Sequence, residues 1–215
     1  WSWLPTVLTM GHGAVVTGGN LFGIAHAIGG NYGGPISRVD LKSPPKLDDH
    51  TVLAPVKGKD AWWFSRAAQM AVVDGKIYIT KNDWTTPAPQ NADEVGDRLL
   101  VFDPKDYQAS SFAGGHRWDG KNWKEARTPA KDLGPLPFEI GHGSALVALP
   151  PKWSGLVGDN GGLFLLAGCT PSNHEGYGPP SAKYAIYDIA SGKYTLGMLP
   201  DTTGTGSSAC LHGGK

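Results

Sequence analysis

The chain of 215 residues has little charge and no long apolar run. Charged residues make up 18% of it, and 19 basic residues balance 19 acidic ones. Nucleic-acid binding is disfavoured because no net charge would draw the chain to phosphate backbones or anionic membrane surfaces. Membrane insertion is not expected either, since no segment approaches the roughly 18 uninterrupted apolar residues of a transmembrane helix.

Several targeting and covalent signals are also missing. The N-terminus, WSWLPTVLTMGHG, has no basic region, so no signal peptide is predicted. No Asn-x-Ser/Thr sequon occurs, which weakly disfavours a glycosylated surface protein. Cys169 and Cys210 are too few for a disulfide scaffold, and inert core thiols are favoured over a bridge because each lies in an apolar stretch. The sequence leaves their redox state and the compartment open, with a secreted or extracellular location slightly favoured over a cytoplasmic one.

Glycine and proline are abundant instead. The 31 Gly and 17 Pro together exceed a fifth of the chain, which favours many turns between short elements over long helices. No long, capped helical pattern competes with this interpretation. The length permits a sizeable core, either in one all-β domain or in two small domains.

Four segments repeat one pattern, in which small residues lead into a short apolar strand. They are GHGAVVTGGNLFGIAHAIGG from Gly11, QMAVVDGKIYIT from Gln69, GHGSALVALPP from Gly141 and SSACLHGGK from Ser207. A tight Gly turn follows at once in the first, second and fourth segments. The third reaches its turn after an insertion that contains Trp153. Such turns between apolar runs predict hairpins, because glycine accepts a positive φ without steric cost.

A second series of strands follows these hairpins: ISRVDLKS, RLLVFDPKDY and KYAIYDIASGKY. Their aspartates, Asp40, Asp103 and Asp188, hold equivalent places, and a turn-forming role is favoured over a catalytic one. A fourth element comes next in HTVLAPV, KNWKEARTP and KYTLGMLPD. Many of the strands are continuous apolar runs, which suit strands covered on both faces of a sheet.

This order of elements resembles the kelch-repeat β-propeller family. Its blade joins a small-residue or His-led strand and an Asp-Gly turn to a strand ending in Gly-Gly; a Tyr-Asp strand and an aromatic-bearing strand follow. The stretch YDIASGKYTLGMLPDTTGTGSSACLHGGK is similar to the junction between two blades. The fourth-strand aromatic would be Trp123 in one unit and Tyr194 in the next. The double glycine is matched at Gly29-Gly30, less well at Gly18-Gly19, and replaced at Lys81-Asn82 and Gly168-Cys169.

The resemblance implies an all-β fold, a segment of a kelch-type β-propeller with four-stranded antiparallel blades. The expected division is a last strand of a preceding blade at 1–10, blades at 11–56, 57–128 and 129–200, and a first strand of the next blade at 201–215. Because closed propellers need about four to eight blades, the sequence is interpreted as a segment of a longer propeller, or as one chain of a propeller completed by another.

The long loops predict a binding surface. The loop between the second and third strands of a blade should lie on the same face as the loop that enters the next blade, such as KGKDAWWFSR or RTPAKDLGPLPFEI. Aromatic residues and arginine on the loops of a rigid scaffold are typical anchors for partners. Packing within the loop is the alternative for each aromatic taken singly. The candidate partner-binding residues are Tyr32, Trp62, Trp63, Arg66, Trp84, His174 and Tyr177.

No catalytic residue, metal site or cofactor is predicted. His12 and His142 both lie in Gly-His-Gly at the start of a first strand, where the kelch pattern commonly has His, and no H-x-x-x-H spacing marks a metal site. His26 lies in an apolar strand and is interpreted as a core residue. Copper radical oxidases also use kelch-like propellers, but their Tyr, His and cross-linked Cys residues have no counterparts that can be placed here.

The leading hypothesis is therefore a protein-interaction or assembly module that binds through long loops on one face. Its partner would be another protein or the remaining propeller blades. The alternative is an extracellular carbohydrate-binding or oxidase-type propeller whose catalytic groups lie outside this segment, motivated by low charge and eight Trp. A third hypothesis is a purely structural subunit of a large assembly. An enzyme is less favoured than a binding module.

Overall fold

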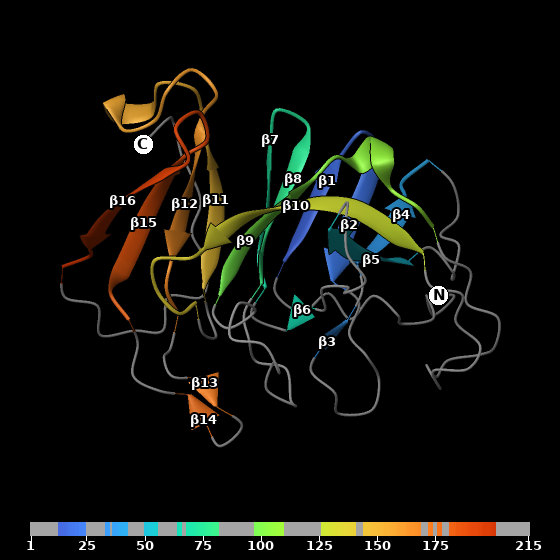
Figure 1. Cartoon of the computed structure of the whole chain (residues 1–215), viewed down its shortest axis with the longest axis horizontal. Coiled ribbons are helices and arrows are strands. Elements are labelled where there is room, and N and C mark those ends of the chain that lie inside the picture. Colours follow the sequence, from blue (N-terminus) through green and yellow to red (C-terminus); the bar gives the residue numbers. More distant parts are fainter. Residues whose placement is uncertain are drawn as a thin grey trace.

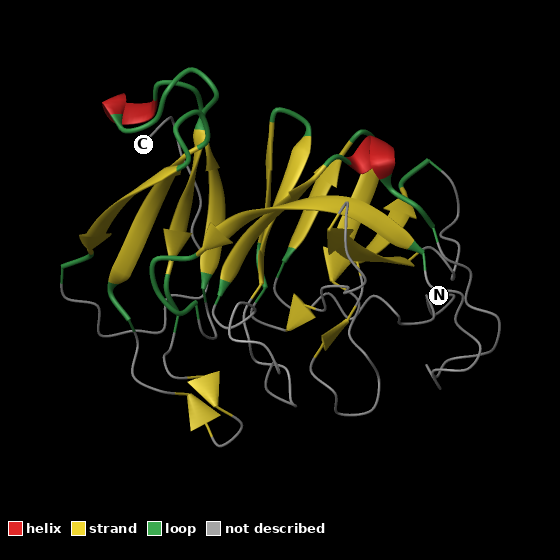
Figure 2. Ribbon diagram, viewed as in Figure 1, coloured by secondary structure: helices red, strands yellow, loops and turns green. Residues whose placement is uncertain are grey.

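All regular structure in the described part of the chain is β-strand, apart from two short 3-10 turns (Figures 1 and 2). The computed structural model describes residues 13–24, 33–34, 36–42, 50–55, 64–65, 68–81, 97–109, 126–140, 144–168, 172–173, 176–177 and 181–200. The expected all-β class is confirmed within these ranges. They contain no helix that would be long and apolar enough to cross a membrane.

Three units of four antiparallel strands make up the fold, and in each unit the strands lie side by side in chain order. The first unit contains β1 (Ala14–Thr17), β2 (Asn20–Ile24), β4 (Ile36–Asp40) and β5 (His50–Pro55). The second contains β7 (Met70–Val73), β8 (Lys76–Lys81), β9 (Arg98–Phe102) and β10 (Arg127–Pro135). The third contains β11 (Ala145–Leu149), β12 (Gly162–Leu166), β15 (Lys183–Asp188) and β16 (Lys193–Met198).

The predicted hairpins form the start of each unit. Gly18 and Gly19 turn between β1 and β2 with φ of 57° and 78°, and Asp74 and Gly75 turn between β7 and β8 with φ of 48° and 71°. Two successive positive φ angles match the twist of the flanking strands, which is why glycine is needed in these turns. The third hairpin, β11–β12, carries the expected insertion, with the 3-10 turn η3 (Trp153–Gly155) inside it.

The fourth strand of the second unit differs from the sequence prediction. RTPAKDLGPLPFEI was expected to be a loop, but its first nine residues form β10, and the boundary expected after residue 128 falls inside this strand. The physical reason is pairing on two sides: residues 127–130 run parallel to β5, and residues 131–135 pair antiparallel with β9. Pairing with β5 and β9 outweighs the local preference of this segment, which favours a loop because the segment contains Pro and Gly. Trp123 lies outside the described residues.

Apolar side chains cover both faces of the central strands, as the continuous apolar runs predicted. Along β9, Leu100 and Phe102 pack between the first and second units, whereas Leu99 and Val101 pack between the second and third. Leu100 and Leu99 are fully buried. The second unit is therefore the middle layer of the molecule.

The first strands of the three units are neighbours. β7 contacts both β1 and β11 (Figure 1). A Cβ on Gly13, just before β1, would approach the carbonyl oxygen of Ala68 to 2.8 Å, so the chain entering β1 abuts the chain entering β7. The outer strands of the first two units also meet, because β5 pairs with β10 and creates one eight-stranded sheet in the order β1-β2-β4-β5-β10-β9-β8-β7. The strands expected at 1–10 and 201–215 lie outside the described residues.

Candidate functional site

The short strands β3 (Gly33–Gly34), β6 (Phe64–Ser65), β13 (Ser172–Asn173) and β14 (Gly176–Tyr177) lie at the end of the units opposite the hairpin turns, and we call this end the loop face (Figure 1). β3 (Gly33–Gly34) lies in the loop between β2 and β4, and β6 (Phe64–Ser65) lies in the loop that enters the second unit. These two strands pair antiparallel, with Gly33 opposite Ser65 and Gly34 opposite Phe64. The two kinds of loop therefore meet between the first and second units, as the strand order predicted.

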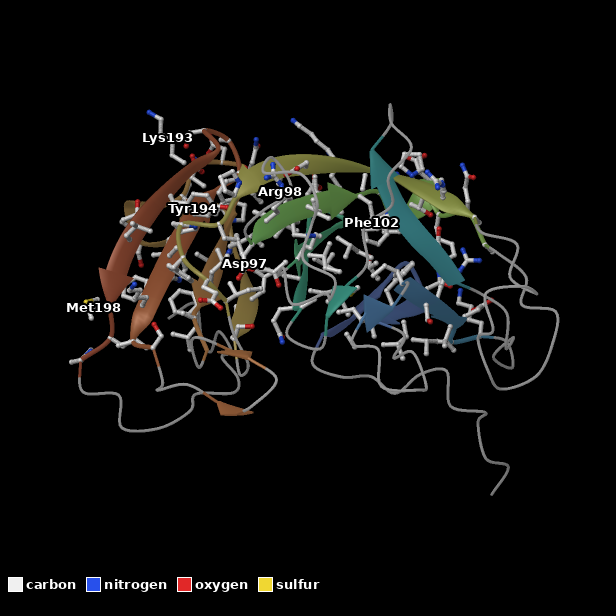
Figure 3. All side chains as sticks on the ribbon, turned by 60° about the horizontal axis from the view of Figure 1, so that its bottom comes forward. Asp97, Arg98, Phe102, Lys193, Tyr194 and Met198 are labelled. Carbon is white, nitrogen blue, oxygen red and sulfur yellow. The ribbon has the colours of Figure 1, made fainter. Side chains whose placement is uncertain are left out.

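Asp97 joins the same two kinds of loop between the second and third units. It ends the loop between β8 and β9 and is only 8% exposed. Its Oδ2 accepts a hydrogen bond from the backbone N–H of Ile140 at 2.5 Å, and its carbonyl accepts one from Leu136 at 2.6 Å. Ile140 and Leu136 belong to the segment that enters the third unit, so Asp97, labelled in Figure 3, joins the two loops through its carboxylate and its carbonyl.

Sequence reasoning missed Asp97. It stands in Gly96-Asp97 directly before a strand, and no spacing or repeat marks it, because the donor to its carboxylate lies 43 residues away in the sequence. A polar residue before an apolar run was the only signal. That signal is common at strand ends and does not distinguish a loop tether from a surface turn.

In the third unit, a small hairpin of β13 (Ser172–Asn173) and β14 (Gly176–Tyr177) projects from the loop between β12 and β15. The base of this loop is closed by a hydrogen bond from the N–H of Ser181 to the carbonyl of Gly168 at 3.1 Å. The carbonyl of Ala182 accepts another from Leu199 at 2.8 Å, which ties the exit of β16 to the same place. The loop between β12 and β15 is thus held at its base by hydrogen bonds, and its β13–β14 hairpin lies on the loop face.

The candidate partner-binding residues lie on these loops, but the structure leaves their side chains outside its described part. Of these candidates, only Tyr177 lies within the described residues, where its backbone forms part of β14. Their role in binding stays a prediction. The other six candidates, which lie outside the described residues altogether, are Tyr32, Trp62, Trp63, Arg66, Trp84 and His174.

An ion pair supports the outer rim of the second unit. Nε of Arg98 in β9 lies 2.6 Å from Oδ2 of Asp132 in β10, with the two side chains 20% and 28% exposed. Oδ1 of Asp132 accepts the backbone N–H of Gly134 at 2.8 Å, where the pairing of β10 changes register. The carboxylate is thus engaged on both oxygens, and we interpret the pair as a support for the irregular part of β10.

Three tyrosines line the boundary between the second and third units. The rings of Tyr187 and Tyr194 lie with centroids 4.8 Å apart, and Tyr78 belongs to the same apolar cluster. Burial raises the pKa of all three phenols, and the nearby Tyr187 adds to the rise for Tyr78 and Tyr194. Phenols that stay protonated cannot accept protons near neutral pH. This cluster therefore serves packing between units; Tyr194 is labelled in Figure 3.

The repeated aspartates act in turns, as predicted. Oδ1 of Asp40 accepts the N–H of Lys42, and Oδ1 of Asp103 accepts that of Lys105, each at 2.9 Å. The carboxylate of Asp188 accepts three hydrogen bonds. The donors are the N–H of Gly158 at 2.9 Å, the N–H of Ser191 at 3.0 Å and the hydroxyl of Ser191 at 2.5 Å. These contacts, the Gly158 bond first, lower the pKa of Asp188 to about 2.

Within the described ranges, no three His, Cys, Asp or Glu side chains gather closely enough to hold a metal ion. His12, His26 and His142 lie outside those ranges, and so do both cysteines. No protein-family model and no curated protein matches the chain. A proposal on function therefore depends on the geometry of the loop face and on the residue types in its loops.

Proposed function

We propose that the chain is a protein-interaction or assembly module built on a kelch-type β-propeller, and that it binds its partner through the loop face. The observation that carries the proposal is the tethering of two kinds of loop at successive unit boundaries, by β3–β6 pairing and by Asp97. Loops held on a rigid scaffold lose little conformational freedom on binding, which suits them to recognition.

The propeller part of the proposal is supported by the arrangement of the units. Each has four antiparallel strands in chain order, the first strands are neighbours, and apolar side chains fill both boundaries between units. This is how sheets stack radially around an axis, where each covers the apolar face of the next. The kelch assignment comes from the repeated sequence pattern, above all the Gly turns and the Asp-ended third strands.

The test replaces three loop aromatics together: Trp62→Ala, Trp84→Ala and Tyr177→Ala. The probe is a phage-displayed library of random peptides, panned on the immobilised full chain. We expect peptides enriched on the unsubstituted chain to lose binding to the triple variant by about tenfold or more, because aromatic anchors dominate recognition. The thermal unfolding midpoint is expected to stay nearly unchanged.

The matched control is placed at the hairpin-turn end, which the proposal leaves out of binding. Leu41, 54% exposed, lies beside the β1–β2 turn, where its N–H bonds the carbonyl of Gly19, and Leu156, 42% exposed, lies in the β11–β12 insertion. Leu41→Ala with Leu156→Ala should leave peptide binding intact. Equal binding by the triple variant and the unsubstituted chain would contradict the proposal. Glycan-array binding lost in the triple variant, without peptide binding, would favour the carbohydrate alternative.

A further inference from the structure

The outer edge of the third unit is built differently from those of the first two. β5 and β10, the outer strands of the first two units, pair with each other over four residues. β16, the outer strand of the third, pairs only with β15 among the strands that the structure describes. An unpaired strand edge offers a row of N–H and C=O groups to another strand.

The direction of these groups follows from the register of β15 and β16. The N–H of Leu199 donates to Ala182 at 2.8 Å, and the pairing continues with Lys183 opposite Met198 and Tyr184 opposite Gly197. In an antiparallel pair, alternate residues point their backbone groups to the partner strand. The odd-numbered residues of β16 therefore face β15, whereas residues 194, 196 and 198 direct their N–H and C=O groups outward.

The same three residues carry an apolar stripe. Tyr194, Leu196 and Met198 alternate along β16 and share the face turned toward the second unit, since Tyr194 belongs to the cluster at that boundary. Only Tyr194 is covered: Leu196 is 60% exposed and Met198 is 71% exposed. Figure 3 shows Lys193 and Met198 at the two ends of the strand, with Tyr194 next to Lys193. Natural edges usually carry charge, proline or a bulge, and residues 194–198 have none of the three.

We infer that β16 is a self-association edge and that its partner is β16 of a second copy of this chain, paired antiparallel about a two-fold axis at Leu196. In this register Tyr194 lies opposite Met198 and Leu196 opposite Leu196, so every outward-directed residue meets another one. The apolar stripes then form one continuous row of cross-strand pairs.

Charge fits the same register. Lys193 is the only charged residue of β16, and the two-fold axis places it opposite Leu199 of the second copy, not opposite another lysine. Both third units would combine into one eight-stranded antiparallel sheet, an isologous contact that closes at two copies. The contact uses a strand edge and not the loop face, so it is independent of the proposed function.

The test compares two lysine substitutions on neighbouring exposed residues. Leu196→Lys places two like charges on the two-fold axis and removes the central apolar pair, whereas Thr195→Lys points to the opposite face of the sheet and meets Gly197. Sedimentation velocity of the full chain over the micromolar range should show a monomer–dimer equilibrium that Leu196→Lys weakens by about tenfold or more. Thr195→Lys should leave the equilibrium within about twofold of the unsubstituted chain.

A charge-swap experiment tests whether residue 196 faces residue 196 of the second copy across the two-fold axis. Leu196→Lys and Leu196→Glu should each be monomeric, and their mixture should form a heterodimer, because residue 196 faces its own copy. Matching thermal midpoints of the variants at the lowest concentration show that they fold. The inference is overturned by a chain that stays monomeric throughout, by equal effects of the lysines at 195 and 196, by assembly beyond a dimer, or by a mixture without heterodimer.

Discussion

At the scale of single residues, buried or turn-forming carboxylates hold strand ends in place by accepting backbone N–H groups. Asp97 fixes the segment that enters the third unit through Ile140, and Asp188 fixes Gly158 in the insertion between β11 and β12. Bonds to a charged acceptor are stronger than neutral ones. Both contacts cross at least thirty residues of sequence, so each closes a long loop as well as a local turn.

The lowered pKa of Asp188 makes a pH prediction. Its folded pKa, about 2, is below the ordinary value of 3.8, so the carboxylate contributes stability above about pH 4 and loses this contribution as the pH falls from about 4 to about 2. We expect Asp188→Asn to lower the urea midpoint at pH 5. The difference from the unsubstituted chain should shrink steadily toward pH 2.

Asp159→Asn is the control for this measurement. Asp159 pairs with Lys152 at 2.9 Å on the surface, where both side chains are 78% exposed, and such pairs contribute only about 0–1 kcal/mol. Its substitution should change the midpoint little at any pH. A constant gap between Asp188→Asn and the unsubstituted chain from pH 5 to pH 2 would contradict the assignment.

At the scale of elements, the junction of β5 and β10 is the least regular part of the fold. The parallel pairing depends on two fully buried hydroxyls, Thr51 and Thr128, whose oxygens lie 2.7 Å apart. Thr51 also donates to the carbonyl of Ala126 at 3.2 Å, and Thr128 accepts the N–H of Gln108 at 2.9 Å. The network ties together β5, β10 and the segment after β9.

A double-mutant cycle tests this network. Thr128→Val keeps the shape of the side chain but removes the acceptor of the Gln108 N–H and a partner of Thr51, so we expect a loss of about 1–3 kcal/mol. Thr51→Val should cost a similar amount, and the double variant should cost less than the sum of the two.

Urea unfolding, monitored by circular dichroism, gives the three free-energy differences. Thr128→Ser is the control, because it keeps the hydroxyl and removes one buried methyl, which is expected to cost about 1 kcal/mol. Strictly additive effects of the two valine substitutions would show that the hydroxyls do not interact.

At the scale of the whole molecule, the three units differ in how they are covered. The second has apolar neighbours on both faces, and its strands contribute to both large clusters. The third is covered on one face by the second unit and on the other by the insertion, where Val157 packs on Leu149 and Ile186. Because only the second unit contributes to both large clusters, its backbone hydrogen bonds should be protected most strongly.

Hydrogen exchange measures this difference. On the Leu196→Lys variant, used so that self-association does not contribute, amides in β8 and β9 should exchange most slowly and those in β16 fastest among the strands of the second and third units. The expected span is at least about tenfold in rate. Peptides from β2 provide an internal comparison, because its buried side chains Phe22 and Ile24 belong to only one of the two large clusters. Equal protection in β9 and β16 would contradict a middle layer.

Local chemistry was sufficient to predict much of the fold. The Asp74-Gly75 turn specified a hairpin because few residue pairs accept two positive φ angles. The apolar run Leu99–Phe102 specified a strand buried on both faces, since a one-sided strand would alternate. The candidate binding residues stay predictions, because strand order brings β3 beside β6 but does not orient Trp62 or Trp84.

The amino-acid sequence by itself thus determined the all-β class and the hairpins, because these follow from turn conformation and hydrophobic period. Only the tertiary structure decided that residues 127–135 form a strand, that Asp97 tethers two loops, and that Leu196 and Met198 stay exposed on β16. Each of these depends on partners distant in the sequence, and pairing over such distances leaves no local pattern.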